Sequence, residues 1–194
     1  MNTVANVAGI LLAAGRGRRF DPQGQRNKLL QPLAGGTPVV VASARNLLSL
    51  LPRVIAVVPP QDGGVAETLR ALGCEVTTCE DADSGMAASL VQAITASLPQ
   101  ADGWLVALGD MPYIAPSTLR ALLDALANGA DIAAPVLAGR RGNPVAFGAR
   151  HLPDLLALRG EHGARSLLRS APVVEVTVND PGILRDIDTP ADLA

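Results

Sequence analysis

Short apolar runs alternate with alanine- and leucine-rich stretches along most of the chain. The runs have the length and β-branched content of buried strands, whereas the stretches between them repeat apolar residues at helical spacing. This alternation is typical of β-α-β units around a largely parallel sheet, so we expect an α/β fold. The expected strands cover residues 7–13, 53–58, 75–78, 104–108, 131–135 and 173–178, and the expected helices cover 39–51, 84–97 and 116–128.

Local signals refine these boundaries. Thr37 followed by Pro38 predicts a helix N-cap and a proline at the first helical position, and Gly129 predicts the end of the helix over 116–128. Two extended pieces within 134–148 flank the segment Gly139 to Gly142, which predicts a hairpin or a projecting loop.

Composition limits the class of protein. The chain has 194 residues, 48% of them hydrophobic and only 2% aromatic, so we expect one domain over 1–194 with a core of Ala, Leu and Val and no disorder. A net charge of -2 argues against general duplex binding, so no nucleic-acid partner is expected. The apolar runs break before the ~18–20 residues of a membrane span, which predicts a soluble, cytoplasmic protein.

The cysteines and histidines give little sign of chemistry. Cys74 and Cys79 are five residues apart across an extended stretch, which places them on opposite faces of a strand and argues against a disulfide or a metal pair. His151 and His162 are expected at the surface. No G-x-S-x-G motif is present, so serine-hydrolase chemistry is not favoured.

A cationic loop follows the first expected strand. Small residues end that strand at Gly15, and four cations come soon after it: Arg16, Arg18, Arg19 and Lys28. Ligands bind at the carboxyl ends of strands in open α/β sheets, and clustered cations there suit a polyphosphate. The G-x-G-x-x-G and Walker patterns are both absent, and a solvated basic loop is the alternative.

Aspartates follow at two further places. Asp110 follows the expected strand over 104–108 after one glycine. A carboxylate at this place could bind Mg²⁺ together with substrate phosphates, and the alternative is a turn or capping aspartate. Asp186 and Asp188 share a face if their segment is extended, and one of them could complete a metal site; a capping or solvated cluster is the alternative. Ser84 to Ser89 opens a helix with small residues that could hold a base or ribose, or only cap the helix.

Six separated motifs, in this order, resemble the MobA-like nucleotidyltransferases, most closely the branch of molybdenum cofactor cytidylyltransferases. They are Leu12-Ala13-Ala14-Gly15 with Arg19, Lys28-Leu29-Leu30, Gly85-Met86-Ala87-Ala88-Ser89, Leu108-Gly109-Asp110-Met111-Pro112, Arg141-Gly142-Asn143-Pro144 and Asp186-Ile187-Asp188-Thr189-Pro190. The resemblance covers nearly the whole chain. It implies a Rossmann-like three-layer fold with a mostly parallel mixed sheet and a projecting hairpin.

The resemblance also implies an activity: Mg²⁺-assisted transfer of CMP from CTP to the terminal phosphate of molybdenum-bound molybdopterin, with release of pyrophosphate. A molybdoenzyme or its insertion chaperone is a further implied partner. The residues implied are Arg19, Lys28 and Asp110 for catalysis; Leu12, Ala13, Ala14, Gly15, Arg16, Arg19, Lys28, Ser84, Gly85 and Ser89 for the nucleotide; Arg141, Gly142, Asn143 and Pro144 for the acceptor; and Asp110 with Asp188, or Asp186 in its place, for the metal.

The sequence departs from the family pattern in one loop, where residues 21–27 lengthen the approach to Lys28 and could move Arg26 into the phosphate site. The choice of CTP depends on Ala14, because the guanylyl branch tends to carry glycine there and a methyl group narrows the base pocket against a purine. The alternatives are a guanylyltransferase or sugar-phosphate nucleotidyltransferase of the same fold, and a non-catalytic molybdenum cofactor carrier or insertion chaperone.

Overall fold

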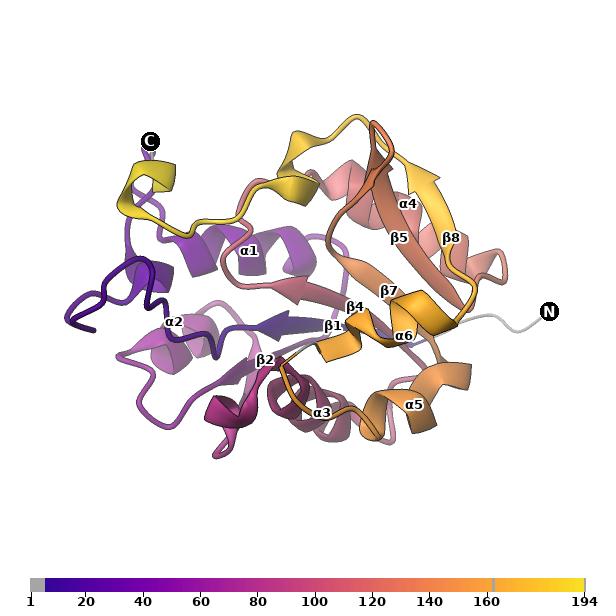
Figure 1. The fold of residues 1–194 in the computed structure, drawn as a ribbon, viewed down its shortest axis with the longest axis horizontal. Helices are drawn as coiled ribbons and strands as arrows, with labels where there is room; N and C mark the ends of the chain where they lie inside the picture. Colours follow the sequence, from indigo (N-terminus) through magenta and orange to yellow (C-terminus); the bar gives the residue numbers. More distant parts are fainter. Residues whose placement is uncertain (1–5, 162, 194) are drawn as a thin grey trace.

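The computed structural model describes residues 6–161 and 163–193, and its strands form one mixed sheet (Figure 1). The strand order is β3-β2-β1-β4-β7-β5-β6, with β8 paired to β5 on the side opposite β7. Strands β1 to β4 are parallel, β7 is antiparallel to both of its neighbours, and β8 is parallel to β5. The strands are β1 (Val7–Leu12), β2 (Val54–Val58), β3 (Glu75–Thr78), β4 (Gly103–Leu108), β5 (Ile132–Leu137), β6 (Arg140–Arg141), β7 (Val145–Gly148) and β8 (Val174–Thr177).

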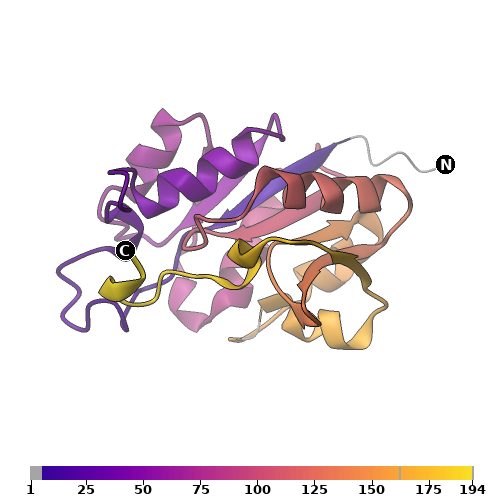
Figure 2. The ribbon, with the colours of Figure 1, turned by 90° about the horizontal axis from the view of Figure 1, so that it is seen from above.

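Helices cover both faces of the sheet and give three layers (Figure 2). Apolar side chains of α1, α2 and α4 pack on one face, and those of α3, α5 and α6 pack on the other. The expected α/β fold with a mostly parallel mixed sheet is confirmed. The helices are α1 (Val39–Leu48), α2 (Val65–Ala71), α3 (Met86–Ser97), α4 (Pro116–Ala127), α5 (Leu152–Leu156) and α6 (Leu167–Ser170), and 3-10 turns include η1 (Lys28–Leu30), η2 (Ala82–Ser84), η5 (Pro181–Leu184) and η6 (Pro190–Leu193).

The core is built mainly from Ala, Leu, Val and Ile, as the composition predicted. Its two largest fully buried side chains, Trp104 and Phe147, are cross-strand neighbours on β4 and β7. The indole nitrogen of Trp104 donates a 2.8 Å hydrogen bond to Ser97 Oγ, so burying the ring leaves no polar atom without a partner. This pair fixes the antiparallel strand β7 beside the parallel half of the sheet.

Two boundary predictions are wrong for local backbone reasons. Pro38 is itself the N-cap of α1, with extended φ and ψ of -59° and 145°, and no side chain caps the helix. Thr37 instead accepts a hydrogen bond from the Leu33 amide in the preceding turn. Helix α3 begins at Met86 rather than at residue 84, because Gly85 has a φ of 119° that interrupts helical geometry.

Other predictions hold. Gly129 has a φ of 95° and its amide donates to the Leu126 carbonyl, which ends α4. A hairpin is present in this region, but its turn lies at Ala138 and Gly139, and Arg140–Arg141 form strand β6 rather than part of the predicted loop. Free Cys74 and Cys79 are both buried, and they lie in the cores on opposite faces of the sheet. Burial raises the pKa of the Cys74 thiol to about 11, so this thiol stays protonated and unreactive at neutral pH.

One histidine contradicts the prediction, because His151 is buried and its Nδ1 lies 3.0 Å from Asp154 Oδ2. His151 is the N-cap residue of the short helix α5, which sequence periodicity did not reveal. His162 lies outside the described residues. Within residues 6–161 and 163–193, no helix has both the length and the apolar character needed to cross a membrane.

Candidate functional site

The carboxyl ends of β1 and β4 lie side by side, because Leu12 is the register partner of Leu108. A cavity of about 360 Å³ opens at this edge of the sheet. Its walls come from the loop after β1, from Asp110 after β4, and from the turn that precedes α3. The lining residues are Leu12, Ala14, Gly15, Arg16, Arg18, Lys28, Leu29, Ala82, Asp83, Gly85, Met86, Ser89, Leu108, Asp110 and Glu161.

Most of the predicted nucleotide-binding residues line this cavity, but three do not. Ala13 is buried, and its amide continues the strand pairing by donating to the Val57 carbonyl. Ser84 is exposed, and its hydroxyl donates 2.8 Å to the Asp81 carbonyl. Arg19 lies outside the lining, with its side chain 78% exposed and paired with Asp188.

Gly109 lets the loop after β4 approach β1 closely. Its amide donates 2.8 Å to the Leu12 carbonyl, and a Cβ at this position would lie 3.1 Å from that oxygen and 3.3 Å from Ala13 Cβ. Contacts this short would push the loop away from the strand. The glycine therefore sets the position of Asp110, the next residue.

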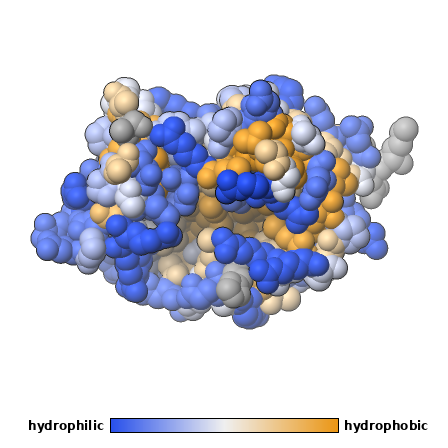
Figure 3. Space-filling view, turned by 45° about the horizontal axis from the view of Figure 1, so that its top comes forward, coloured by the Kyte–Doolittle hydropathy of each residue, from blue (hydrophilic) through white to orange (hydrophobic). Residues whose placement is uncertain are grey.

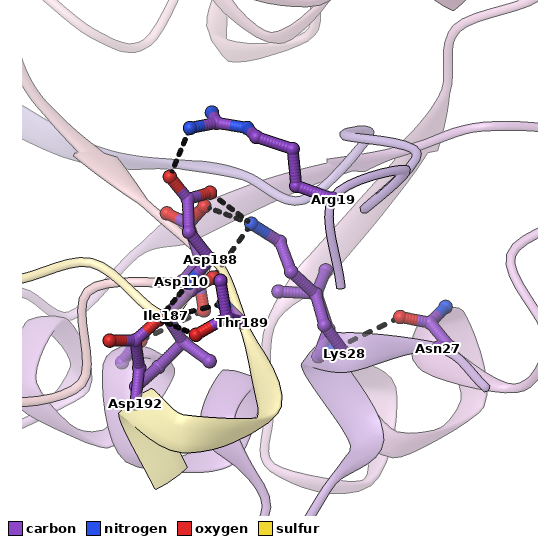
Figure 4. Close-up of polar contacts among 11 residues, drawn as sticks. Arg19, Asn27, Lys28, Asp110, Ile187, Asp188, Thr189 and Asp192 are labelled. Carbon is purple, nitrogen blue, oxygen red and sulfur yellow. Dashed lines mark hydrogen bonds and ion pairs between the residues drawn. The ribbon is translucent and has the colours of Figure 1, made fainter. Parts of the chain in front are cut away.

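A buried lysine is the centre of the polar site (Figure 4). Lys28 Nζ donates 2.6 Å to Asp110 Oδ2 and 2.9 Å to the Ile187 carbonyl, and it lies 3.6 Å from Asp188 Oδ1. Arg19 Nη1 lies 2.6 Å from Asp188 Oδ2. The side chain of Lys28 is only 8% exposed, so these oxygens compensate a charge that burial alone would disfavour.

Three carboxylates gather beside Lys28. Asp110, Asp186 and Asp188 each offer an oxygen, and these oxygens lie within 4.8 Å of one another. Burial raises the pKa of Asp186 above its ordinary value, and the neighbouring charge of Asp188 adds to this increase. A cluster of hard oxygen donors with mutual repulsion fits Mg²⁺ or Mn²⁺, which prefer carboxylate ligands. Asp186 thus lies in the cluster together with Asp188 rather than only as its substitute.

Asp192, which the sequence analysis did not single out, holds this segment in place. Its Oδ2 accepts hydrogen bonds from the amides of Asp188 and Thr189, at 3.1 and 2.7 Å, and from the Thr189 hydroxyl at 2.8 Å (Figure 4). These three donors lower the pKa of Asp192. The Ile187 amide also donates 2.8 Å to the Asp110 carbonyl, which ties the two aspartate segments together. Thr189 and Asp192 have the spacing of a capping box, and this sequence signal could have identified Asp192.

The longer loop before Lys28 is ordered by its own side chains. Asp21 accepts hydrogen bonds from the amides of Gln23 and Arg26, and these bonds lower its pKa. The Arg26 guanidinium lies 5.6 Å above the Phe20 ring and does not line the cavity. Asn27 Oδ1 caps η1 through the Leu29 amide. Lys28, rather than Arg26, therefore reaches the carboxylates.

The four predicted acceptor residues lie away from the cavity lining. Arg141 forms a 2.8 Å ion pair with Glu175 and donates to the Leu168 carbonyl. The Asn143 amide donates 3.0 Å to the Ile183 carbonyl in η5. A Cβ on Gly142 would lie 2.3 Å from that same oxygen, so this glycine is required by close packing. Pro144 leads directly into β7.

The fold and the site define a nucleotidyltransferase. Residues 9–176 match the family described as "MobA-like NTP transferase domain", and the chain belongs to this family. It is an enzyme that uses a nucleoside triphosphate, as the resemblance implied.

Known relatives agree with this assignment. The chain is 31% identical over 199 residues to the purine catabolism protein PucB of Bacillus subtilis (strain 168), and the alignment covers 95% of this chain and 92% of PucB. It is similar to the crystal structure of Rv0371c from Mycobacterium tuberculosis H37Rv, with a TM-score of 0.81, 31% identity, and coverage of 98% of this chain and 96% of that one. A structure of Rv0371c in complex with manganese has a TM-score of 0.77, 29% identity, and coverage of 97% and 96%.

Proposed function

We propose that the protein is a molybdenum cofactor cytidylyltransferase, which transfers CMP from CTP to the terminal phosphate of molybdenum-bound molybdopterin and releases pyrophosphate. The observation that carries this proposal is the meeting of Arg19 and Lys28 with three carboxylates at the mouth of a cavity beside the carboxyl end of β1. Cations and a metal site together suit a reaction between two anions. We propose residues 1–194 as a single nucleotidyltransferase domain, since both cores pack on one sheet.

Asp110, Asp186 and Asp188 would hold Mg²⁺ or Mn²⁺, and the manganese complex of Rv0371c supports a divalent metal. When bound, the ion would neutralise charge on the triphosphate and on the pyrophosphate that leaves. A cation among the three carboxylates would offset their mutual repulsion, which contributes to the raised pKa of Asp186.

The basic residues would bind and orient the phosphates. Lys28 presents an ammonium group at a fixed place, since Asp110 and the Ile187 carbonyl hold it and its alkyl chain packs beside Gly17. Arg18 lines the cavity, and Arg19 extends from the same loop. The acceptor phosphate is already an anion, so its attack on the α-phosphate needs no general base. These cations would reduce the repulsion between the two anions.

The choice of CTP is supported by the position of Ala14, whose methyl group lies in the cavity lining and reduces the space for a purine. Gly15, Gly85 and Ser89 would contact base and ribose. We place the acceptor near Arg141 to Pro144, outside the nucleotide cavity. The name of PucB connects that relative with purine catabolism. For this protein we propose a molybdoenzyme or its insertion chaperone as the partner.

The test uses the purified protein with Mg²⁺, extracted molybdopterin cofactor and each of CTP, GTP, UTP and ATP in turn. We expect pyrophosphate release with CTP and a CMP group covalently attached to the pterin, identified by mass spectrometry. A control without the pterin should release no pyrophosphate. Transfer of GMP instead, or turnover with a sugar phosphate and not with the pterin, would overturn the cytidylyl assignment.

A further inference from the structure

A segment from the second half of the chain closes one side of the nucleotide cavity. The Ala87 amide at the start of α3 donates 3.2 Å to the Gly160 carbonyl. A Cβ at Gly85 would lie 2.6 Å from that oxygen and 2.9 Å from Glu161 Cα. In Figure 1 the orange chain that follows α5 runs to the start of α3. Gly85 thus lets the backbone that carries Glu161 lie directly against this helix.

Glu161 brings a third acidic side chain to the cavity lining. The acidic residues of the lining are Asp83, Asp110 and Glu161. Asp83 forms an ion pair with Arg16, and Asp110 forms one with Lys28. Glu161 is exposed, and within residues 6–161 and 163–193 its carboxylate has no hydrogen bond or ion pair. A charged carboxylate only accepts hydrogen bonds, so it suits a ligand that offers a donor.

The position of Glu161 indicates which part of a nucleotide it faces. Lys28 packs beside Gly17 in the loop after β1, and repulsion would keep a carboxylate away from the phosphates that this lysine binds. The Glu161 backbone lies instead against Gly85, the residue before Met86, and Met86 is 42% exposed and lines the same cavity as Glu161. Figure 3 shows apolar surface within the hollow that opens between hydrophilic rims. An exposed apolar side chain offers packing to the flat face of a base, and the neighbouring carboxylate then meets its edge.

We infer that Glu161 determines base specificity by accepting a hydrogen bond from the exocyclic amino group of the nucleobase. This role rests on the nucleotide site proposed above and adds a polar contact to the steric effect of Ala14. Cytosine carries this donor at position 4, where uracil carries a carbonyl oxygen. Two acceptors facing each other would disfavour UTP, so the carboxylate both attracts the correct base and rejects the incorrect one.

Calorimetric titration of CTP and UTP, in the presence of Mg²⁺ and without acceptor, tests the inference on wild type, Glu161→Gln and Glu161→Ala. We expect wild type to bind CTP at least about tenfold more tightly than UTP. Glu161→Ala removes the acceptor, and in Glu161→Gln the amide can turn to donate to the uracil oxygen, so both variants should lose most of this ratio. The control Glu67→Gln removes the same charge from the exposed face of α2 and should keep the ratio.

Titrations of GTP and ITP separate this inference from the proposed function, since these nucleotides differ only in the 2-amino group. If wild type binds GTP better than CTP, the cytidylyl proposal fails, while Glu161 should still favour GTP over ITP. If wild type shows no preference within either pair, or if both Glu161 variants keep the wild-type ratios, the inference is overturned. Binding of no nucleotide by folded wild type would overturn both. Circular dichroism confirms that each variant is folded.

Discussion

Lys28 Nζ lies 2.6 Å from Asp110 Oδ2, although the two residues are 82 positions apart in the sequence. The ammonium group also donates to the Ile187 carbonyl, so one buried cation joins the loop after β1, the loop after β4 and the segment around Asp188. Without a ligand it offsets the repulsion among three carboxylates. A divalent cation at the same place would free the ammonium group for a phosphate.

Asp110→Asn should abolish nucleotidyl transfer, because the neutral amide loses most of its attraction for a divalent cation. It also removes the charge that faces buried Lys28, so we expect a loss of about 1–3 kcal/mol in the free energy of unfolding. Pyrophosphate release and urea denaturation measure the two effects. The control is Asp124→Asn on the exposed face of α4, which should change neither. Near-normal turnover of a folded Asp110→Asn protein would contradict the metal role.

Lys28→Ala should raise the KM for the triphosphate and lower kcat, by a combined factor of about 10² or more, because it removes a fixed charge from the phosphate site. Arg26→Ala should have a much smaller effect, since Arg26 stacks on Phe20 outside the cavity. Steady-state kinetics of both variants with varied CTP give the comparison. If Arg26→Ala lowers kcat/KM and Lys28→Ala leaves it unchanged, Arg26 rather than Lys28 is the cation that binds the phosphates.

Asp192→Asn should increase the Mg²⁺ or Mn²⁺ concentration that gives half-maximal activity, because Asp192 orients the Asp188 backbone by accepting three hydrogen bonds. The retained side-chain size makes this a change of charge rather than of packing. Metal titrations at fixed CTP measure the effect. An unchanged metal requirement would mean that the 188–192 turn holds its shape without the carboxylate.

The Asp192→Asn variant should also differ from wild type in the pH dependence of its folding stability. The folded state lowers the pKa of Asp192, so its charged form stabilises the fold above the pKa of the unfolded chain, and this contribution is lost as the pH falls through the folded pKa. Wild type should therefore be more stable than Asp192→Asn by a constant amount well above the ordinary aspartate pKa of about 3.9, and the difference should shrink as the pH falls below that value. Denaturant titrations across this range measure it. A difference that grows as the pH falls would have the wrong sign.

Ala14→Gly should reduce the preference for CTP over GTP, because it removes a methyl group from the cavity lining. One methyl group discriminates by only about 10- to 200-fold, so the change should be moderate. The measurement is the ratio of kcat/KM for CTP to that for GTP in both proteins. A ratio that the substitution leaves unchanged would remove the steric argument and leave base selection to polar contacts.

The sequence predicted the elements that apolar periodicity marks, and it missed those that depend on distant partners. Strand β3 matches its predicted bounds, whereas α2, α5 and α6 were not foreseen because short helices give few periodic positions. The start of α4 at Pro116 was predicted correctly, but the carboxylate beside it was not: Asp180 accepts from the Ala115 amide 65 residues away. Tertiary contact supplies what local propensity lacks.

The site residues that follow strands could be predicted from the sequence, whereas those brought in from later in the chain could not. Strand ends and small residues marked Gly15 and Asp110, because parallel strands bring their carboxyl ends to one edge. That Asp186 and Asp188 lie beside Lys28 depends on the path of the chain after β8, which has no periodic signal. The same holds for Glu161, whose place depends on Gly85, the residue just before α3.

The late position of Asp186 and Asp188 in the chain has a consequence for synthesis. All eight strands precede these residues, so a ribosome adds every strand residue before it adds two of the three clustered carboxylates. A nascent chain that has not reached Asp186 lacks two of the donors that the proposed divalent cation needs. Catalytic competence should therefore be among the last properties to arise during synthesis, together with the burial of Ile187 in the core. A protease that cuts between β8 and Asp186 would separate two of the three carboxylates from the rest of the site.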